Sequence, residues 1–98
     1  MPIEVEVGQE FAIILRSNPT TGYHWQLAGL SDEEIVKLVR SEYKGPEAEL
    51  VGTGGEEVWA FQAISQDETV VSLEYVRPWE KDVPPAEARS FTVLVRQP

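Results

Sequence analysis

The chain has 98 residues, 17 acidic and 8 basic, and its formal net charge of -9 argues against binding to a nucleic-acid backbone or an anionic membrane surface. It contains no cysteine, which excludes disulfides, a thiolate nucleophile and a Cys-ligated metal site. Because a hydrophobic fraction of 42% suits one core at this length, we expect a single domain over residues 1–98.

The first half of the chain alternates apolar and polar residues, which is the pattern of half-buried β-strands. This period of two predicts strands at 3–7, 10–17 and 24–30. Gly8 separates the first two strands, and the turn sequence from Asn18 to Tyr23 separates the second from the third.

The next segment, 35–43, fits a helix and a strand about equally well when it is considered alone. Ile35, Leu38 and Val39 form a helical stripe, whereas Val36 and Leu38 fit a pleat. We choose a strand, because the rest of the chain consists of short β segments separated by turn signals.

Three further strands are expected at 56–65, 69–76 and 89–96, and the first of them is apolar on both faces. Seven short strands with frequent turns predict an all-β protein, an immunoglobulin-like antiparallel β-sandwich.

If consecutive strands run antiparallel, every second connection lies at the same end of the domain. The second, fourth and sixth connections are 18–23, 44–55 and 77–88. They contain the three distinctive loop sequences of the chain, whereas the odd-numbered connections are short. We therefore expect a binding edge made of three loops, as at one end of a variable immunoglobulin domain.

In the first loop, Pro19 fixes its own φ and Gly22 permits a left-handed turn, so Thr20 and Thr21 are held at the tip. Their hydroxyls can meet a polar centre without the cost of desolvating a charge. An ordinary turn is an equally good reading of this loop when it is taken alone.

The second loop, Val51 to Gly55, presents little besides backbone, which allows its amides and carbonyls to approach a partner closely. It is not a phosphate-binding loop, because no Lys follows its glycines. A flexible hairpin end is the alternative.

The third loop offers Arg77 and Trp79, two residue types enriched at interface hot spots, with Pro78 stiffening the chain between them. We expect Trp79 to be exposed. The alternative is that Trp79 folds back on the domain edge and that Arg77 pairs with Glu80 or Glu74.

Catalytic and metal-binding patterns are weak throughout. His24 has no nucleophile that a motif would match to it, and we interpret it as an edge histidine. The acidic pairs 33–34, 56–57 and 67–68 are interpreted as solvated turn charges, not as ligands. We therefore expect no catalytic residue, no metal and no cofactor.

Taken together, the three loops resemble the motifs of the chagasin family, proteinaceous inhibitors of papain-like cysteine peptidases. The family pattern is an Asn-Pro-Thr-Thr-Gly-aromatic loop, a Gly-x-Gly-Gly loop and an Arg-Pro-aromatic loop, in that order. Here they read Asn18 to Tyr23, Gly52 to Gly55, and Arg77 to Trp79. Each motif is weak alone, but the three in order are specific, and the resemblance spans nearly the whole chain.

The resemblance implies a reversible, competitive inhibitor that inserts the loops 18–23, 51–55 and 77–79 into the active-site cleft as a tripartite wedge. It implies that the tip of the first loop approaches the catalytic Cys and His of the peptidase, that the second loop lies along the non-primed cleft, and that the third loop packs on the primed side. The peptidase-binding residues implied are Asn18, Pro19, Thr20, Thr21, Gly22, Tyr23, Gly52, Thr53, Gly54, Gly55, Arg77, Pro78 and Trp79.

The implied partner is a cathepsin L-like or similar papain-like peptidase, bound by a monomer without a cofactor. A non-inhibitory immunoglobulin-like module that reads peptide or carbohydrate through Trp79 and Tyr23 is the alternative. The start, Met1 to Glu4, lacks the regions of a signal peptide, which indicates a cytoplasmic protein unless a leader for secretion or the periplasm was removed.

Overall fold

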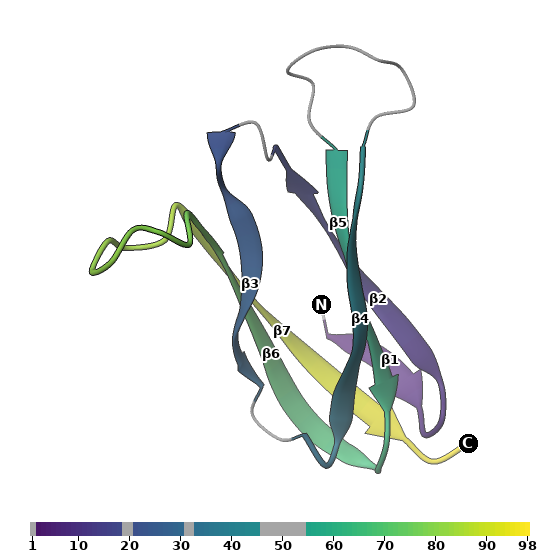
Figure 1. Ribbon diagram of the computed structural model, residues 1–98. Helices are drawn as coiled ribbons and strands as arrows, with labels where there is room; N and C mark the ends of the chain where they lie inside the picture. The colour runs from purple at the N-terminus through teal and green to yellow at the C-terminus, as the bar shows by residue number, and fades with distance from the viewer. Residues whose placement is uncertain (1, 19–20, 31–32, 46–54) are drawn as a thin grey trace.

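The computed structural model describes residues 2–18, 21–30, 33–45 and 55–98, without the side chain of Leu30 (Figure 1). Seven strands are its regular elements: β1 Ile3–Glu6, β2 Glu10–Ser17, β3 His24–Leu30, β4 Val36–Lys44, β5 Gly55–Ala63, β6 Asp67–Val76 and β7 Glu87–Arg96. The residues described include no helix with the length and apolar character needed to cross a membrane.

The strands form two sheets, one with the order β1-β7-β6-β3 and the other with the order β2-β5-β4. The pair of β1 and β7 is parallel, with Ile3 opposite Val93, and the remaining pairs are antiparallel. This arrangement confirms the predicted all-β, immunoglobulin-like sandwich.

All seven expected strands are present, and each boundary lies within two residues of its predicted position. The choice of a strand for 35–43 was correct, because β4 pairs along β5 from Val36 to Lys44. One turn interpretation was wrong: Asp67 and Glu68 belong to β6, where they pair with Val95 and Leu94. Their backbone takes part in the ladder while their side chains stay exposed, so polarity alone did not mark the strand start.

The core lies between the two sheets and receives alternate side chains from both of them. Phe61 of β5, Leu73 of β6 and Val93 of β7 are completely buried. The buried hydrophobic cluster comprises Val5, Ile13, Leu15, Trp25, Ile35, Val36, Trp59, Phe61, Ala63, Val71, Leu73, Val93 and Val95.

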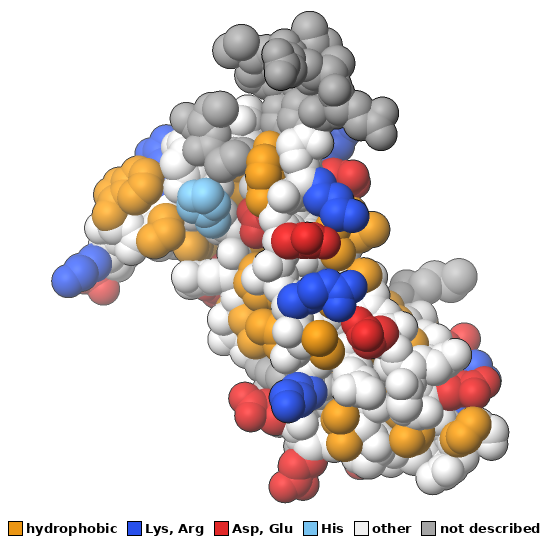
Figure 2. Space-filling model, turned by 45° about the vertical axis from the view of Figure 1, so that its right-hand side comes forward, with side chains coloured by type: hydrophobic (Ala, Val, Ile, Leu, Met, Phe, Trp, Pro, Cys, Tyr) orange, Lys and Arg blue, Asp and Glu red, His pale blue; other side chains and the backbone are white. Residues whose placement is uncertain are grey.

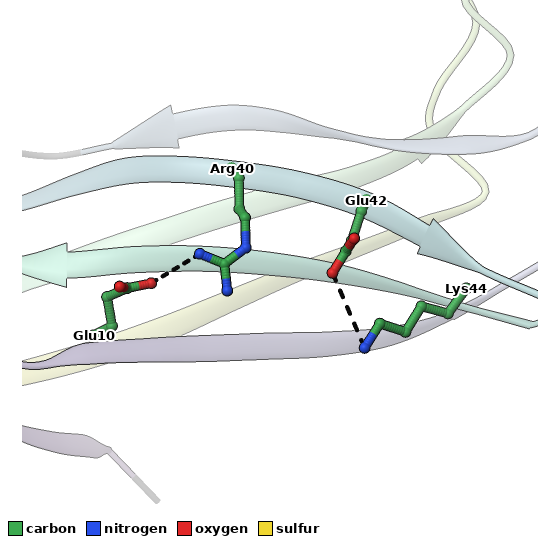
Figure 3. A network of polar contacts seen from close by, with 4 residues as sticks. All are labelled: Glu10, Arg40, Glu42 and Lys44. Carbon is green, nitrogen blue, oxygen red and sulfur yellow. Dashed lines mark hydrogen bonds and ion pairs between the residues drawn. The ribbon is translucent and has the colours of Figure 1, made fainter.

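The outer face of the β2-β5-β4 sheet carries charged pairs. Arg40 of β4 reaches across β5 to Glu10 of β2 at 3.0 Å, and Lys44 lies 4.0 Å from Glu42 (Figure 3). Because all four side chains are about half exposed, these pairs contribute little to stability. Figure 2 shows Lys and Arg interspersed with Asp and Glu on this view of the surface, with no large area of one sign.

The strand ends that flank the three candidate loops gather at one end of the sandwich (Figure 1). At this end Ser17 of β2 pairs with Gly55 of β5, and His24 of β3 pairs with Val76 of β6. The end of β4 is also here, because Lys44 pairs with Glu56. The parity argument made from the sequence is therefore confirmed for the stems of all three loops.

Candidate functional site

The structure describes part of the predicted binding edge. Asn18, Thr21, Gly22 and Tyr23 of the first loop and all three predicted residues of the third loop are described. Of the second loop only Gly55 is described. The predictions for Pro19, Thr20, Gly52, Thr53 and Gly54 lie outside the described residues.

The first loop is closed by Thr21. Its backbone N–H donates to the carbonyl of Asn18 at 3.2 Å, and its hydroxyl donates to the same carbonyl at 2.7 Å. Gly22 follows at φ 86, the left-handed conformation that the sequence predicted for it. The Thr21 hydroxyl proton is thus used within the turn, while the side chain remains exposed and its oxygen faces the Tyr23 N–H at 3.4 Å.

A stack of aromatic rings connects this loop to the core. Trp25 is buried at 5% exposure, and its ring lies 5.0 Å from that of Tyr75. Tyr75 in turn stacks on Tyr23 at 5.2 Å, and its hydroxyl accepts the N–H of Asn18 at 2.9 Å. Both ends of the first loop are therefore held by Tyr75 of β6.

Arg77 fastens the third loop to the first. Its Nε donates to the carbonyl of Thr21 at 3.1 Å, and its guanidinium lies 4.4 Å above the centre of the Tyr23 ring. The pairing with Glu80 that the sequence suggested is also present at 4.0 Å. Arg77 therefore connects two loops of the predicted binding edge and also makes one of the ion pairs that the alternative interpretation proposed.

Trp79 is 67% exposed, which confirms that the third loop displays its aromatic residue. One edge of its ring nevertheless lies over Gly22, where a Cβ would overlap it. The turn itself is closed by the Glu80 N–H, which donates to the carbonyl of Arg77 at 3.0 Å. Among the described residues, the first and third loops are therefore joined by Arg77, through Thr21 and Tyr23, and by Trp79, through Gly22.

Gly55 is the first residue of β5, not part of the loop tip. It pairs with Ser17, and a Cβ there would overlap the carbonyl of Lys44 and approach the hydroxyl of Tyr43. The glycine is therefore required where the stems of the first and second loops meet.

The structure corrects the interpretation of one acidic pair. Glu56 is exposed as expected, but Glu57 is buried at 8% exposure. One of its carboxylate oxygens accepts from the Ser17 hydroxyl at 2.6 Å and from the Trp25 backbone N–H at 3.1 Å. The period of two in β5 carried the signal, since residue 57 lies on the same face as Trp59 and Phe61, which are buried.

The remaining polar candidates do not gather into a catalytic or metal-binding group. His24 is exposed at the start of β3, in keeping with an edge histidine. In the ranges that the structure describes, no three carboxylate or imidazole groups lie where they could hold a metal ion.

The comparisons with known proteins identify a family. The family model of the Chagasin family peptidase inhibitors, I42, matches residues 4–95. The chain is 34% identical to Chagasin of Trypanosoma cruzi over 97 residues, which cover 96% of this chain and 86% of that protein.

Two solved structures are also similar. The crystal structure of the cysteine protease inhibitor EhICP2 from Entamoeba histolytica matches with a TM-score of 0.84 at 25% identity, covering 97% of this chain and 86% of that one. The Leishmania mexicana ICP matches with a TM-score of 0.66 at 31% identity, covering 97% and 89%. The similarity therefore extends over nearly the whole length of each chain.

Proposed function

Because this chain belongs to the chagasin family of peptidase inhibitors, it inhibits papain-like cysteine peptidases, and we propose that it does so by filling their active-site cleft with three loops. It is an inhibitor and not an enzyme. The loops are 18–23, 51–55 and 77–79. Residues 1–98 form one domain, and one molecule of the inhibitor binds each peptidase molecule.

The observation that carries the proposal is the connection between the first and third loops. Arg77 joins them through the Thr21 carbonyl and the Tyr23 ring, while Trp79 stays 67% exposed beside Gly22. An edge held in this way loses little conformational entropy when it docks, which favours tight binding. The exposed Trp supplies the type of anchor that dominates many interfaces.

The first loop blocks the cleft because it is a poor substrate. Cleavage requires a peptide carbonyl held in line with the catalytic thiolate, in a near-attack geometry. The two bonds from Thr21 to the Asn18 carbonyl hold these two residues of the first loop together. A closed turn of this kind occupies the place of a substrate without presenting an extended chain to the nucleophile.

Inhibition kinetics test the proposal. The purified protein is titrated against papain and a cathepsin L-like peptidase with a fluorogenic peptide substrate, and the inhibition constant is determined at several substrate concentrations. We expect competitive inhibition with one inhibitor bound per enzyme. Absence of inhibition at micromolar protein across several papain-like peptidases would sink the proposal, and non-competitive inhibition would remove the cleft-blocking mechanism.

The nature of the target is tested in the same assay. A serine peptidase and a metallopeptidase serve as controls, and neither should be inhibited, because the loops are proposed to fit the cleft of papain-like enzymes. Slow cleavage of the first loop during incubation, detected by mass spectrometry, would contradict the closed-turn mechanism.

A further inference from the structure

The buried carboxylate of Glu57 lies directly beneath the first loop. It extends from β5 toward the other sheet, where β3 is an edge strand. The backbone of an edge strand has donors and acceptors on one side that no neighbouring strand satisfies. At Trp25, the Glu57 oxygen accepts the backbone N–H at 3.1 Å.

The two donors to this oxygen bracket the loop. Ser17 is the last residue of β2, and Trp25 is the second residue of β3. One oxygen therefore holds both stems of the loop 18–23, at 2.6 Å and 3.1 Å. The indole N–H of Trp25 adds a second link between the stems, because it donates to the carbonyl of Arg16 at 2.9 Å.

Glu57 also relates the first loop to the second. It lies two residues after Gly55, the residue that pairs with Ser17 where the two stems meet. A carboxylate costs free energy to bury unless hydrogen bonds compensate it, and the other inward residues of this part of β5, Trp59 and Phe61, are apolar. Packing alone would be served as well by an apolar side chain, so the carboxylate calls for a separate explanation.

We propose that Glu57 is a positioning residue for inhibition: without touching the peptidase, it holds the stems of the first loop at the separation that docking requires. This role rests on the function proposed above. When only a fraction of the molecules has a binding-competent loop, the apparent affinity falls by that fraction. Once the complex has formed, the peptidase itself holds the loop. The loss of affinity should therefore appear in the association rate constant and not in the dissociation rate constant.

The test compares two substitutions of nearly equal size. Glu57→Gln keeps an oxygen where both donors point, so its association rate constant should stay within about 1.5-fold of the wild-type value. Glu57→Leu fills the space without an acceptor, so association should slow about tenfold or more while the dissociation rate constant stays within about twofold. Both rate constants are measured by surface plasmon resonance, with a catalytically blocked papain-like peptidase immobilised on the surface.

Val93→Ala is the matched control for stability. Val93 is buried and pairs with Ile3 and Thr69, at the end of the sandwich opposite the loops. A cavity there should lower the thermal midpoint but leave the association rate constant unchanged at temperatures where the variant is folded. A purely structural role for Glu57 predicts that Glu57→Leu behaves like this control.

Amide hydrogen exchange gives a second measurement, which needs no peptidase. Loss of the acceptor should speed exchange at Trp25 and Tyr23 in Glu57→Leu far more than in Val93→Ala. Unchanged exchange at Trp25 together with a wild-type association rate would overturn the proposal.

The remaining outcomes are also decisive. If Glu57→Leu does not fold, Ser17→Ala carries the test: loss of one donor should slow association about threefold, and an unchanged rate contradicts the positioning role. If the wild-type protein inhibits and Glu57→Leu associates with the peptidase at the same rate, the positioning role of Glu57 is wrong but the proposed function stands. A wild-type protein that does not inhibit removes the proposed function and this role with it.

Discussion

Trp79 exposes 67% of its surface while one edge of its ring lies over Gly22. Exposed apolar residues also occur elsewhere, and Ile14 on the outer face of β2 is 56% exposed. The two residues differ in their surroundings, because the Trp79 ring lies against Gly22 of the first loop, which Arg77 also contacts through the Thr21 carbonyl. This difference gives Trp79 a predicted role that Ile14 does not have.

Trp79→Ala should weaken inhibition by about 2 kcal/mol, a factor of roughly 30, because it removes a large aromatic anchor from the proposed contact surface. Ile14→Ala removes another exposed apolar side chain, on the outer face of β2, and should change the inhibition constant less than about twofold. Inhibition constants and thermal midpoints are measured for both variants. Equal effects of the two substitutions on inhibition would contradict the assignment of the third loop.

Gly22→Ala places a Cβ at φ 86 and against the Trp79 ring. The backbone conformation costs about 1–2 kcal/mol of stability, and displacement of the ring should raise the inhibition constant about tenfold. Gly8→Ala is the control, since Gly8 has φ 91 but an added Cβ there meets no atom within 4 Å. It should lose similar stability and inhibit like the wild type, and a matching loss of inhibition in Gly8→Ala would refute the role of the Gly22 contact.

At the residue scale, the sequence predicted which side chains are special better than it predicted their partners. It identified Gly22 as a left-handed turn and Trp79 as exposed, because φ preference and turn chemistry are local properties. The contact of Arg77 with Thr21 and Tyr23 depends on residues more than 50 positions away, so no local pattern indicates it. Glu57 was misread because an acidic residue near a turn usually faces water.

At the scale of elements, β6 is the strand that joins the core to the binding edge. Tyr75 stacks between Trp25 and Tyr23 and accepts the N–H of Asn18. Tyr75 thus contacts a core residue and both ends of the first loop, so the stack fixes the position of the loop relative to the core. Loss of the ring should therefore affect inhibition more than loss of the hydroxyl.

Tyr75→Phe keeps the ring and removes only the acceptor, which should cost about 1 kcal/mol of stability and raise the inhibition constant about threefold. Tyr75→Leu also removes both ring contacts, each of which contributes about 0.5–1.5 kcal/mol, and should raise it about tenfold or more. Denaturant unfolding and inhibition assays on both variants measure these effects. A Tyr75→Phe variant that inhibits as poorly as Tyr75→Leu would show that the stack has no separate role.

The strands themselves were predictable because their pattern is periodic. Alternation placed most of the strands, 56–65 was recognised as a run apolar on both faces, and the ambiguous segment 35–43 was decided correctly from its β neighbours. The assignment of strands to sheets was not predictable in the same way. β3 lies in one sheet with β6, β7 and β1, while β2 lies in the other sheet with β5 and β4. The sheet to which a strand belongs depends on which apolar faces pack together in the folded protein. Alternation in the sequence shows only that a strand has one apolar face.

For the whole molecule, charge governs how fast a target is met. The net charge of -9 should attract a peptidase with a basic surface around its cleft and speed association at low ionic strength. We expect the association rate constant with such a peptidase to fall several-fold between about 20 and 200 mM salt, with little change in the dissociation rate constant. Stopped-flow fluorescence at a series of salt concentrations measures both.

A peptidase with an acidic surface is the control for this prediction, because raising the salt concentration should leave its association rate constant unchanged or increase it. The same negative slope with both peptidases would contradict electrostatic steering and would indicate a salt effect on the loops themselves. The distribution of charges of both signs on the surface seen in Figure 2 limits the effect to a modest size.

The parallel pair of β1 and β7 has a consequence for synthesis of the protein. Ile3 lies opposite Val93, so β1 finds its partner only after the segment that contains Val93 has left the ribosome. Contacts between residues so distant in sequence make folding slow compared with helical proteins of this size. During translation the apolar face of β1 must therefore wait without its partner until β7 has been synthesised.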